Sequence, residues 1–397
     1  MSEAPHLCEG HPLARAYRAG SPLCPVLSPS GEALKGIGGR LSVGPEHFSV
    51  HELPRYRASG EGEHCFVHIL KVGRSTDEAL EALAQGSSVP VEGIGYAGRK
   101  DRDAVSTQWL SLPCTPEEVS SADPEVVVLS ASPHEQKLKL GHLSGNLFSV
   151  LIDEVEAPEL LDDCLSALAR GVPNYFGPQR FGRPWYSAPL SEGQPHPMDA
   201  TGAYIQDPLN PARDNVDRAL ELLAMSQAKG RAPKMKKKTF KLMLSALQSA
   251  LFNLWLGERL RDGLGAQVIE GDVCRKLEGG TFTSSDSAED SARLMRGEIE
   301  VLGPLIGPKL FPAQAEALAR EEALYERWGL SEALRGQLGR AWRGDRRAMR
   351  LRPAGLKARR EQRGLRLSFT LPSGAYATTI AGALIDPNAV FRRQAES

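Results

Sequence analysis

The chain has 397 residues, which is long enough for roughly two or three domains that each bury a core. Hydrophobic residues make up 41% and charged residues 24%, which excludes a disordered chain and fits an ordinary soluble globular protein. The formal net charge is -1, so any preference for an acidic or basic partner must come from the distribution of charge rather than from its sum.

The first part of the chain, from Gly39 to about Ile152, is rich in expected strands. Apolar spacing predicts strands over residues 48–53, 65–70, 125–129 and 146–152. Between them, Ser75 and Glu78 have the spacing of a capping box, which predicts a helix that begins there and continues to Ala84. A further helix is expected over residues 158–170, with proline in its first turn.

The rest of the chain changes character twice. Residues 184–211 are rich in Pro, Gly, Ser, Asp and Asn and are expected to form a boundary or a long surface connection. Helical spacing then covers 216–226, 240–261 and 312–328, with strands and turns expected over 268–301. Residues 365–371 alternate like a strand, and 374–385 resemble a loop that enters a helix.

We expect a cytoplasmic protein without membrane spans or metal sites. Met1 to Gly20 lacks the apolar segment of a signal peptide, and Leu242 to Leu256 is interrupted by polar residues, as in a buried helix. The six cysteines are scattered without a CxxC pair, which argues against a disulfide framework or a zinc site and favours reduced thiols.

Basic residues are clustered although the total charge is near zero. One cluster contains Lys229, Arg231, Lys234, Lys236, Lys237, Lys238 and Lys241. A longer one contains Arg335, Arg340, Arg343, Arg346, Arg347, Arg350, Arg352, Lys357, Arg359, Arg360, Arg363 and Arg366, opposed locally by Asp345 and Glu361. Two such clusters favour nucleic acid as the partner over a merely solvated charged face.

One run carries the clearest chemical signal, GYAGRKDRDAVSTQ at residues 95–108. Apolar residues on both sides predict strand, tight loop and strand, with glycines at the turn and Asp101 at the crest. Because Arg99 and Lys100 precede this acid, we expect its pKa to be depressed, which leaves an ionised nucleophile or base.

A second run, NYFGPQRFGR at residues 174–183, combines aromatic, amide and guanidinium side chains around glycines. Aromatic faces stack on bases and amides bind base edges, although a structural corner of the core would have the same composition. Taken singly, each run is compatible with a structural role.

Together, the motifs of this chain resemble the TruD family of tRNA pseudouridine synthases. The resemblance rests on blocks in family order from about residue 36 to 386: PEHFSVHE at 45–52, GEGEH at 60–64, YAGRKD at 96–101, KLKLGHLSGNLF at 137–148, NYFG at 174–177, SALQSALFN at 245–253 and LPSGAYAT at 371–378.

The resemblance implies isomerisation of uridine to pseudouridine in tRNA, at position 13 by family precedent, with Asp101 as the nucleophile. It implies that Phe48, Phe176 and Tyr376 supply aromatic surface to a flipped uridine and Asn174 an amide, and Lys100 is a further candidate for substrate contact or loop packing. No cofactor or metal is expected, and we expect a monomer whose partner is tRNA.

The implied fold is α/β (α+β), with a mixed, mostly antiparallel pseudouridine-synthase-type sheet and a mostly helical inserted domain. The catalytic domain is expected to be discontinuous, over 1–199 and 347–397, and the insertion to cover 200–346. Two alternatives remain at this stage: an RNA-binding or RNA-chaperone protein that does not use the reaction, and a hydrolase with Asp101 as general base.

This chain departs from the family pattern at two positions. Ser42 stands where the family usually has a lysine, and Gly382 stands where an arginine is common. A basic partner for Asp101 is therefore expected from Arg40 or from elsewhere.

Overall fold

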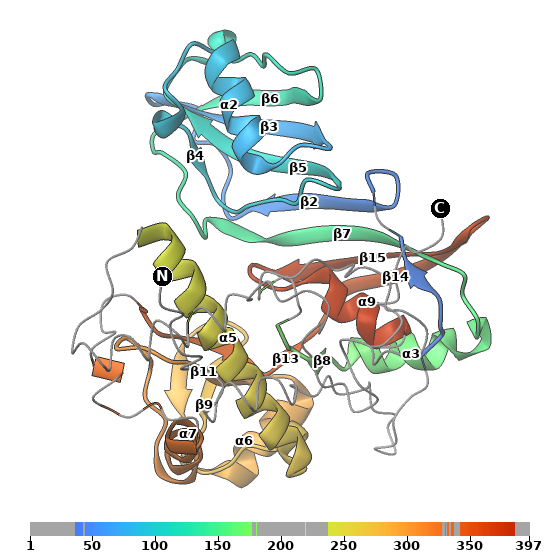
Figure 1. Ribbon diagram of the computed structural model, residues 1–397, viewed down its shortest axis with the longest axis vertical. Helices are drawn as coiled ribbons and strands as arrows, with labels where there is room; N and C mark the ends of the chain where they lie inside the picture. The colour runs from blue at the N-terminus through green and yellow to red at the C-terminus, as the bar shows by residue number, and fades with distance from the viewer. Residues whose placement is uncertain are drawn as a thin grey trace, which may run out of the picture. The chain divides into compact units, whose positions relative to one another are not determined.

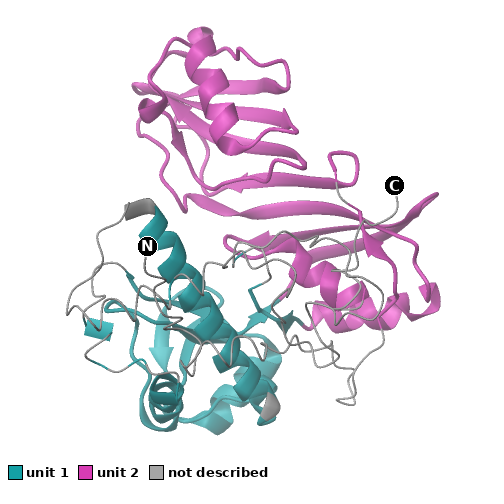
Figure 2. Cartoon of the chain, viewed as in Figure 1, with its two compact units in different colours: residues 1–34, 171–351, 386–397 teal, residues 35–170, 352–385 magenta. Residues whose placement is uncertain are grey.

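The computed structural model describes residues 36–42, 44–176, 180, 219, 237–327, 330, 332, 335, 336 and 342–385. The chain divides into two compact units, shown in separate colours in Figure 2. Unit 2 comprises residues 35–170 and 352–385, and unit 1 comprises 1–34, 171–351 and 386–397. Unit 2 therefore contains Asp101 and is assembled from two separate stretches of the chain.

Unit 2 is built on a sheet that has nine strands among the described residues (Figure 1). Its strands are β1 (Arg40–Leu41), β2 (Phe48–Pro54), β3 (His64–Val72), β4 (Gly95–Tyr96), β5 (Val105–Leu112), β6 (Val126–His134), β7 (Leu143–Asp153), β14 (Ala354–Glu361) and β15 (Gly364–Pro372). The order is β14-β15-β7-β2-β5-β3-β6, with β1 beside β7 and β4 beside β5. Only the β2–β5 pair among these described strands is parallel, which confirms the mixed, mostly antiparallel sheet.

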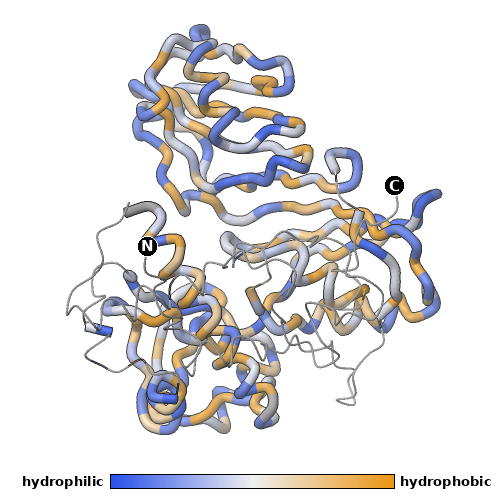
Figure 3. Tube along the Cα trace, in the orientation of Figure 1, coloured by the Kyte–Doolittle hydropathy of each residue, from blue (hydrophilic) through white to orange (hydrophobic). Residues whose placement is uncertain are grey.

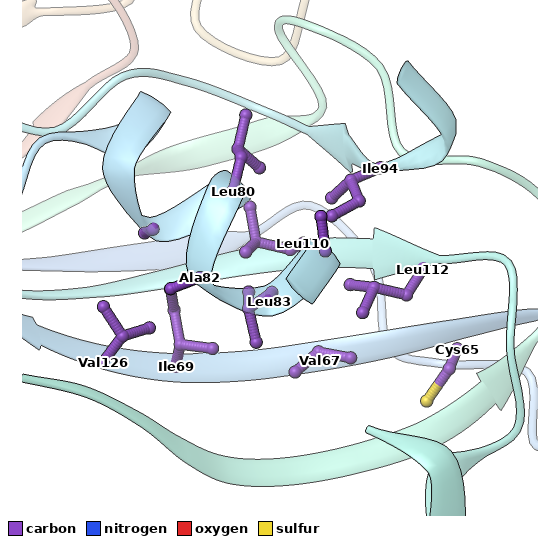
Figure 4. Packing of buried hydrophobic residues seen from close by; sticks show 12 residues of the cluster. Cys65, Val67, Ile69, Leu80, Ala82, Leu83, Ile94, Leu110, Leu112 and Val126 are labelled. Carbon is purple, nitrogen blue, oxygen red and sulfur yellow. The ribbon is translucent and has the colours of Figure 1, made fainter. Parts of the chain in front are cut away.

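Helix α2 (Thr76–Gly86) covers β3 and β5 and begins with the predicted capping box. The Ser75 hydroxyl accepts a hydrogen bond from the Glu78 N–H, and the Glu78 carboxylate accepts one from the Ser75 N–H. Figure 4 shows the core under this helix, where Leu80 and Leu83 pack against Val67, Ile69, Leu110 and their neighbours. This packing anchors the N-terminus of α2 at a fixed place on the sheet.

The other helices of unit 2 are α3 (Leu161–Ala169) and α9 (Ala377–Ile385), which contact each other, and α9 also contacts β7. Short 3-10 turns, η1 (Val91–Gly93), η2 (Pro116–Glu118) and η3 (Pro158–Leu160), connect the strands and helices. The expected helix over 158–170 thus begins as a 3-10 turn, and the expected helix after residue 374 is confirmed.

Strand register decides which side chains lie on the face that α2 covers. Lys71 of β3 pairs with Ser106 of β5, and Ser106 pairs with Val50 of β2, so the three share one face. Because side chains alternate along a strand, this is also the face of Ile69, which packs under α2. The alternation is visible in Figure 3 as changes of hydropathy along the strands of this unit.

Unit 1 combines the long helix α5 (Lys237–Arg261) with a four-stranded sheet of order β10-β9-β11-β12. The strands are β9 (Val273–Lys276), β10 (Thr281–Thr283), β11 (Ile299–Leu305) and β12 (Asp345–Ala348), and the remaining elements are α6 (Ser287–Arg296), α7 (Ala315–Arg327), η5 (Leu264–Ala266), β8 (Val172–Pro173) and β13 (Arg350–Leu351). The predicted helices over 240–261 and 312–328 are confirmed as α5 and α7. The prediction of strands and turns over 268–301 is wrong for α6.

The boundaries of the units differ from the expected insertion at 200–346. Strand β8 pairs with β13, and the Asn174 N–H donates to Met349 O at 2.9 Å, so the chain from residue 171 onward is bonded within unit 1. The expected connection at 184–211 and most of the expected helix at 216–226 lie outside the described residues. Each helix that the structure describes is too short or too polar to cross a membrane.

Candidate active site

The loop from Ala97 to Ala104 presents Asp101 between two paired strands. Strand β4 pairs antiparallel with the far end of β5, Gly95 with Ser111 and Tyr96 with Leu110, so the chain turns back within this loop. A side chain at Gly95 would collide with the Leu138 carbonyl, which explains the glycine. The predicted order of strand, loop and strand is confirmed, with Asp101 in the loop, although the first strand is only Gly95–Tyr96 and residues 91–93 form a 3-10 turn.

Two buried polar side chains hold the backbone of this loop. Gln108 Nε2 donates to Gly98 O at 2.7 Å, and the Lys100 N–H donates to Thr76 Oγ1 at 2.9 Å. Thr76 Oγ1 also donates to Gln108 Oε1 at 3.2 Å, which joins the two anchors. Because Thr76 opens α2 and Gln108 belongs to β5, the core of unit 2 fixes the conformation of the loop.

Lys100 is buried in the interior and forms an ion pair with Glu52 of β2, whose side chain is also buried. Glu52 Oε1 also accepts a hydrogen bond from the Trp109 N–H at 3.2 Å. Burial raises the pKa of Glu52, and the Lys100 ammonium and the Trp109 N–H oppose that shift. Of the two roles considered for Lys100, substrate contact and loop packing, this geometry favours loop packing.

Lys71 is the cation that the sequence analysis missed. Its side chain is fully buried, with 0% of the residue exposed, and its Nζ donates to Asp101 O at 2.8 Å and to Arg74 O. Burial lowers the pKa of Lys71 to about 8 despite the nearby Asp101 carboxylate. The available signal was a single lysine between two apolar residues near the end of a mainly apolar strand, Leu70-Lys71-Val72.

The expected depressed pKa of Asp101 is wrong. The residue is exposed, yet protein atoms around the carboxyl displace water, and this desolvation raises the pKa above its ordinary value of 3.8. Lys71 and, more weakly, Lys100 lower it, whereas Asp103 raises it. The cations of the run do not dominate because Lys100 is paired with Glu52, and Arg99 donates to Asp77 at 2.8 Å.

Arg40, the other expected partner of Asp101, forms an ion pair with Glu154 at 3.0 Å. Ser42, in the position of the family's usual lysine, donates a hydrogen bond to the buried Asp153. Gly382 lies within α9. The positive charge that acts on Asp101 in unit 2 therefore comes mainly from Lys71.

Phe48 and Tyr376 belong to the same unit as Asp101. Phe48 opens β2, and the parallel pairing of Ser49 with Val105 places it beside the end of the Asp101 loop. Its half-buried ring meets Phe148 edge to face, with 6.2 Å between centroids. Tyr376 is half-buried and lies immediately before α9.

Asn174 and Phe176 belong to unit 1, where Arg347 contacts both. Asn174 Oδ1 accepts from Arg347 Nη2 at 2.6 Å, and Asn174 Nδ2 donates to Ala348 O at 2.9 Å. The Arg347 guanidinium carbon lies 3.9 Å from the centroid of the Phe176 ring, and Asn253 bonds both the N–H and the carbonyl of Phe176 at 2.9 Å. The sequence placed Arg347 in a basic cluster without singling it out.

Only some of the arginines and lysines in the two basic clusters are exposed in the described part of the chain. Most of the first lies outside the described residues. In the second, Arg346 forms a buried ion pair with Glu321, and Arg335 forms a partly exposed one with Glu322 at 2.7 Å, acids that lie outside the cluster in the sequence. The exposed cations of unit 2 in this cluster gather on the β14–β15 hairpin: Lys357, Arg359, Arg360 and Arg363. Of these, Arg359 pairs with Glu361, and Arg363 lies 3.8 Å from Asp153.

Fold and site together define an α/β protein with a mixed sheet and a loop, held by buried hydrogen bonds, that exposes two carboxylates, Asp101 and Asp103. Among the described residues, no group of three or more His, Cys, Asp or Glu side chains is arranged to hold a metal ion.

The comparisons with known proteins specify this class further. The family model "tRNA pseudouridine synthase D (TruD)" matches residues 32–189 and 204–382. A tRNA pseudouridine synthase D of Anaeromyxobacter sp. strain Fw109-5 is 40% identical over 361 residues, which cover 90% of this chain and 95% of that protein. The corresponding protein of a Thermus thermophilus strain is 37% identical over 373 residues, 91% of this chain and 93% of that protein.

The chain belongs to the TruD family. A solved structure of a candidate tRNA pseudouridine synthase D from Methanosarcina mazei has a TM-score of 0.64 with 21% identity, and the match covers 98% of this chain and 100% of that one. That likeness supports the fold.

Proposed function

We propose that this protein isomerises uridine to pseudouridine in tRNA, at position 13, with Asp101 as the nucleophile. The observation that carries the proposal is the Asp101 loop: an exposed carboxylate on a backbone fixed by Gln108, Thr76 and Lys71, in a chain of the TruD family. A nucleophile needs access to its substrate and a fixed position, and this loop supplies both.

The reaction is balanced without an oxidant or a second substrate. The bond between N1 of uracil and C1′ of ribose breaks, and a bond between C5 and C1′ forms. The proton leaves C5, and N1 gains one. The Asp101 carboxylate can assist by adding to C1′ of the ribose or to C6 of the ring, and it is released when the new bond is complete.

The target base has to leave its stack before this chemistry can occur. We assign Phe48 and Tyr376, which share unit 2 with Asp101, to flat contact with the flipped base. Asn174 and Phe176, which the resemblance implies as RNA contacts, are both largely buried in unit 1 and held by Arg347, so we keep them only as secondary candidates for RNA contact. Lys100 is assigned to support of the loop rather than to the substrate, because its ammonium is buried on Glu52.

The proposed tRNA substrate also indicates which surfaces bind RNA and in which compartment the protein acts. The exposed cations of the β14–β15 hairpin suit phosphate contacts, and unit 1 offers further arginines for recognition of RNA shape. We propose a monomer that acts in the cytoplasm, where tRNA is modified, and sedimentation of the protein with and without tRNA tests the monomer.

The test is to incubate the full chain with an unmodified tRNA transcript and to map pseudouridine by carbodiimide primer extension. We expect a stop that reports position 13 with the wild type and none with Asp101→Asn. Asp103→Asn is the matched control, since it removes an exposed carboxylate two residues away. Its stop should persist.

Other outcomes identify the alternatives. Tight tRNA binding by the wild type without any modified nucleotide would favour an RNA-binding protein. Mass spectrometry separates isomerisation, which leaves the tRNA mass unchanged, from hydrolysis by Asp101 as general base, which releases a base or cleaves the chain.

A further inference from the structure

The Asp101 loop rests on a buried ammonium group. Lys71 lies on β3 on the face covered by α2, is 0% exposed, and donates from Nζ to Asp101 O at 2.8 Å and to Arg74 O. Burial of a lysine is costly unless hydrogen bonds or opposite charges offset the desolvation of its ammonium. Here both acceptors are backbone carbonyls, and one belongs to the proposed nucleophile.

The surroundings of Lys71 make its charge act on Asp101. Its cross-strand partners, Ser106 on β5 and Val126 on β6, carry no charge. The charged groups that act on it are Asp101 and Lys100 from the loop and Glu78 from α2. Lys100 is paired with Glu52 and Glu78 with Arg102, so these two have partners of their own.

Among the charges that act on the Asp101 carboxyl, Lys71 has the largest effect, ahead of Asp103 and Lys100. Lys71 therefore acts on Asp101 in two ways: it donates a hydrogen bond to the Asp101 carbonyl, and its positive charge stabilises the Asp101 carboxylate. Arg40, the cation that the sequence suggested, pairs with Glu154, and Ser42, in the position of the family's usual lysine, bonds to Asp153.

We propose that Lys71 is the positioning residue of the catalytic loop: its ammonium fixes the Asp101 backbone through the Asp101 carbonyl and places a buried positive charge that favours the ionised Asp101 carboxyl. This inference rests on the proposed function. Lys71 does not touch the substrate and acts only through Asp101.

The experiment compares full-length Lys71→Met and Lys71→Arg in single-turnover isomerisation of tRNA as a function of pH. Misplacement of a catalytic group costs on the order of 100-fold in rate, so we expect about that loss for Lys71→Met, with the enzyme concentration for half-maximal rate nearly unchanged. Without the ammonium, the acid limb of the pH profile should move to higher pH by about one unit. Lys71→Arg, which keeps the charge, should restore the position of the acid limb.

Thr76→Val is the control for a merely structural role. It removes the hydrogen bonds to the Lys100 N–H and to Gln108 but leaves every charge in place. Its rate should fall while its acid limb stays at the wild-type pH. Arg102→Met, which removes an exposed loop cation paired with Glu78, should also leave the acid limb in place.

The inference is overturned if Lys71→Met has the acid limb of the wild type, or if Thr76→Val and Lys71→Met shift it equally. If Lys71→Met does not fold, as judged by circular dichroism, Lys71→Gln replaces it as a neutral side chain that can still donate to a carbonyl. Absence of pseudouridine with the wild type would instead reject the proposed function, so the two failures are distinguishable.

Discussion

At the scale of single residues, the proposed nucleophile lies at the surface and the cations that act on it lie in the interior. Asp101 is exposed, whereas the cations that act on it, Lys71 and Lys100, are buried beneath the loop. The ammonium groups are therefore shielded from competing phosphates and from salt, which screen an exposed ion pair. Because the Asp101 carboxylate has to approach negatively charged RNA, nearby ammonium groups that stay unscreened favour its ionised form.

Lys71 also predicts how stability depends on pH. Its pKa is about 8 in the fold and 10.5 for an ordinary lysine, so between these values the unfolded chain binds more protons than the folded one. The free energy of unfolding should therefore rise with pH across this window, by on the order of 3 kcal/mol from this group. Urea unfolding at pH 8 and 10 measures the rise.

Lys71→Met is the reference for that measurement, because other lysines, tyrosines and cysteines titrate in the same range. The wild type should gain more stability over the window than the variant does. Parallel curves for the two proteins would show that the fold does not lower the pKa of Lys71.

The sequence indicated Asp101 but not the side chains that hold its loop, and the reason is physical. Asp101 lies in a compact run, GYAGRKD, whose glycines and charges are adjacent in the chain. Lys71, Gln108 and Glu52 reach the same loop from three strands, and only their register brings them together. Cations that are near Asp101 in the sequence, such as Arg99, form ion pairs with other acids.

At the scale of elements, α2 links the core of unit 2 to the loop. Its buried side chains pack on β3 and β5, and Thr76 at its first position bonds the loop backbone. Leu83→Ala should leave a cavity beneath the helix and cost about 3 kcal/mol in the free energy of unfolding. Chemical denaturation of the two proteins measures the loss.

Leu140→Ala is the matched control, because that leucine is 69% exposed. It should change stability by less than about 0.5 kcal/mol. If the two variants were equally stable, the core of Figure 4 would not be what holds α2 on the sheet.

Elements with strong apolar patterns were predictable, and polar ones were not. Strands β3 and β7 and helix α5 bury regular sets of hydrophobic residues, which the sequence displays. Helix α6 is mainly polar, buries only Asp290 and Leu294, and is defined by its Asp286 cap and the Gly297 end. Strand β14 is an exposed, arginine-rich edge whose strand character comes from pairing with β15.

At the scale of the whole molecule, the exposed hairpin β14–β15 predicts a salt-dependent contribution to RNA binding. Replacing Lys357 and Arg360 with Gln should lower the slope of log K against log salt by up to about one unit for each phosphate that is no longer neutralised. Filter binding of tRNA at a series of salt concentrations measures the slope.

Arg335→Gln, Arg343→Gln and Arg346→Gln make a poorer test, since Arg346 and Arg335 are paired inside unit 1. A single charge removed from the acidic helix α7, Arg320→Gln, serves as the control and should leave the slope unchanged because Arg320 is paired with Asp262. An unaltered slope in the hairpin variant would place the phosphate contacts elsewhere.

The pairing of β7 with β15 has a consequence for synthesis on the ribosome. β7 ends at Asp153 and its partner begins at Gly364, so at common elongation rates the nascent chain waits roughly 10 to 40 s for that strand. During this interval one edge of β7 has unpaired backbone groups beside Phe148 and Val150, the features that recruit other strands. Any fragment that stops before Gly364 keeps that edge open for its lifetime, so premature termination yields an aggregation-prone chain even though it contains the complete Asp101 loop.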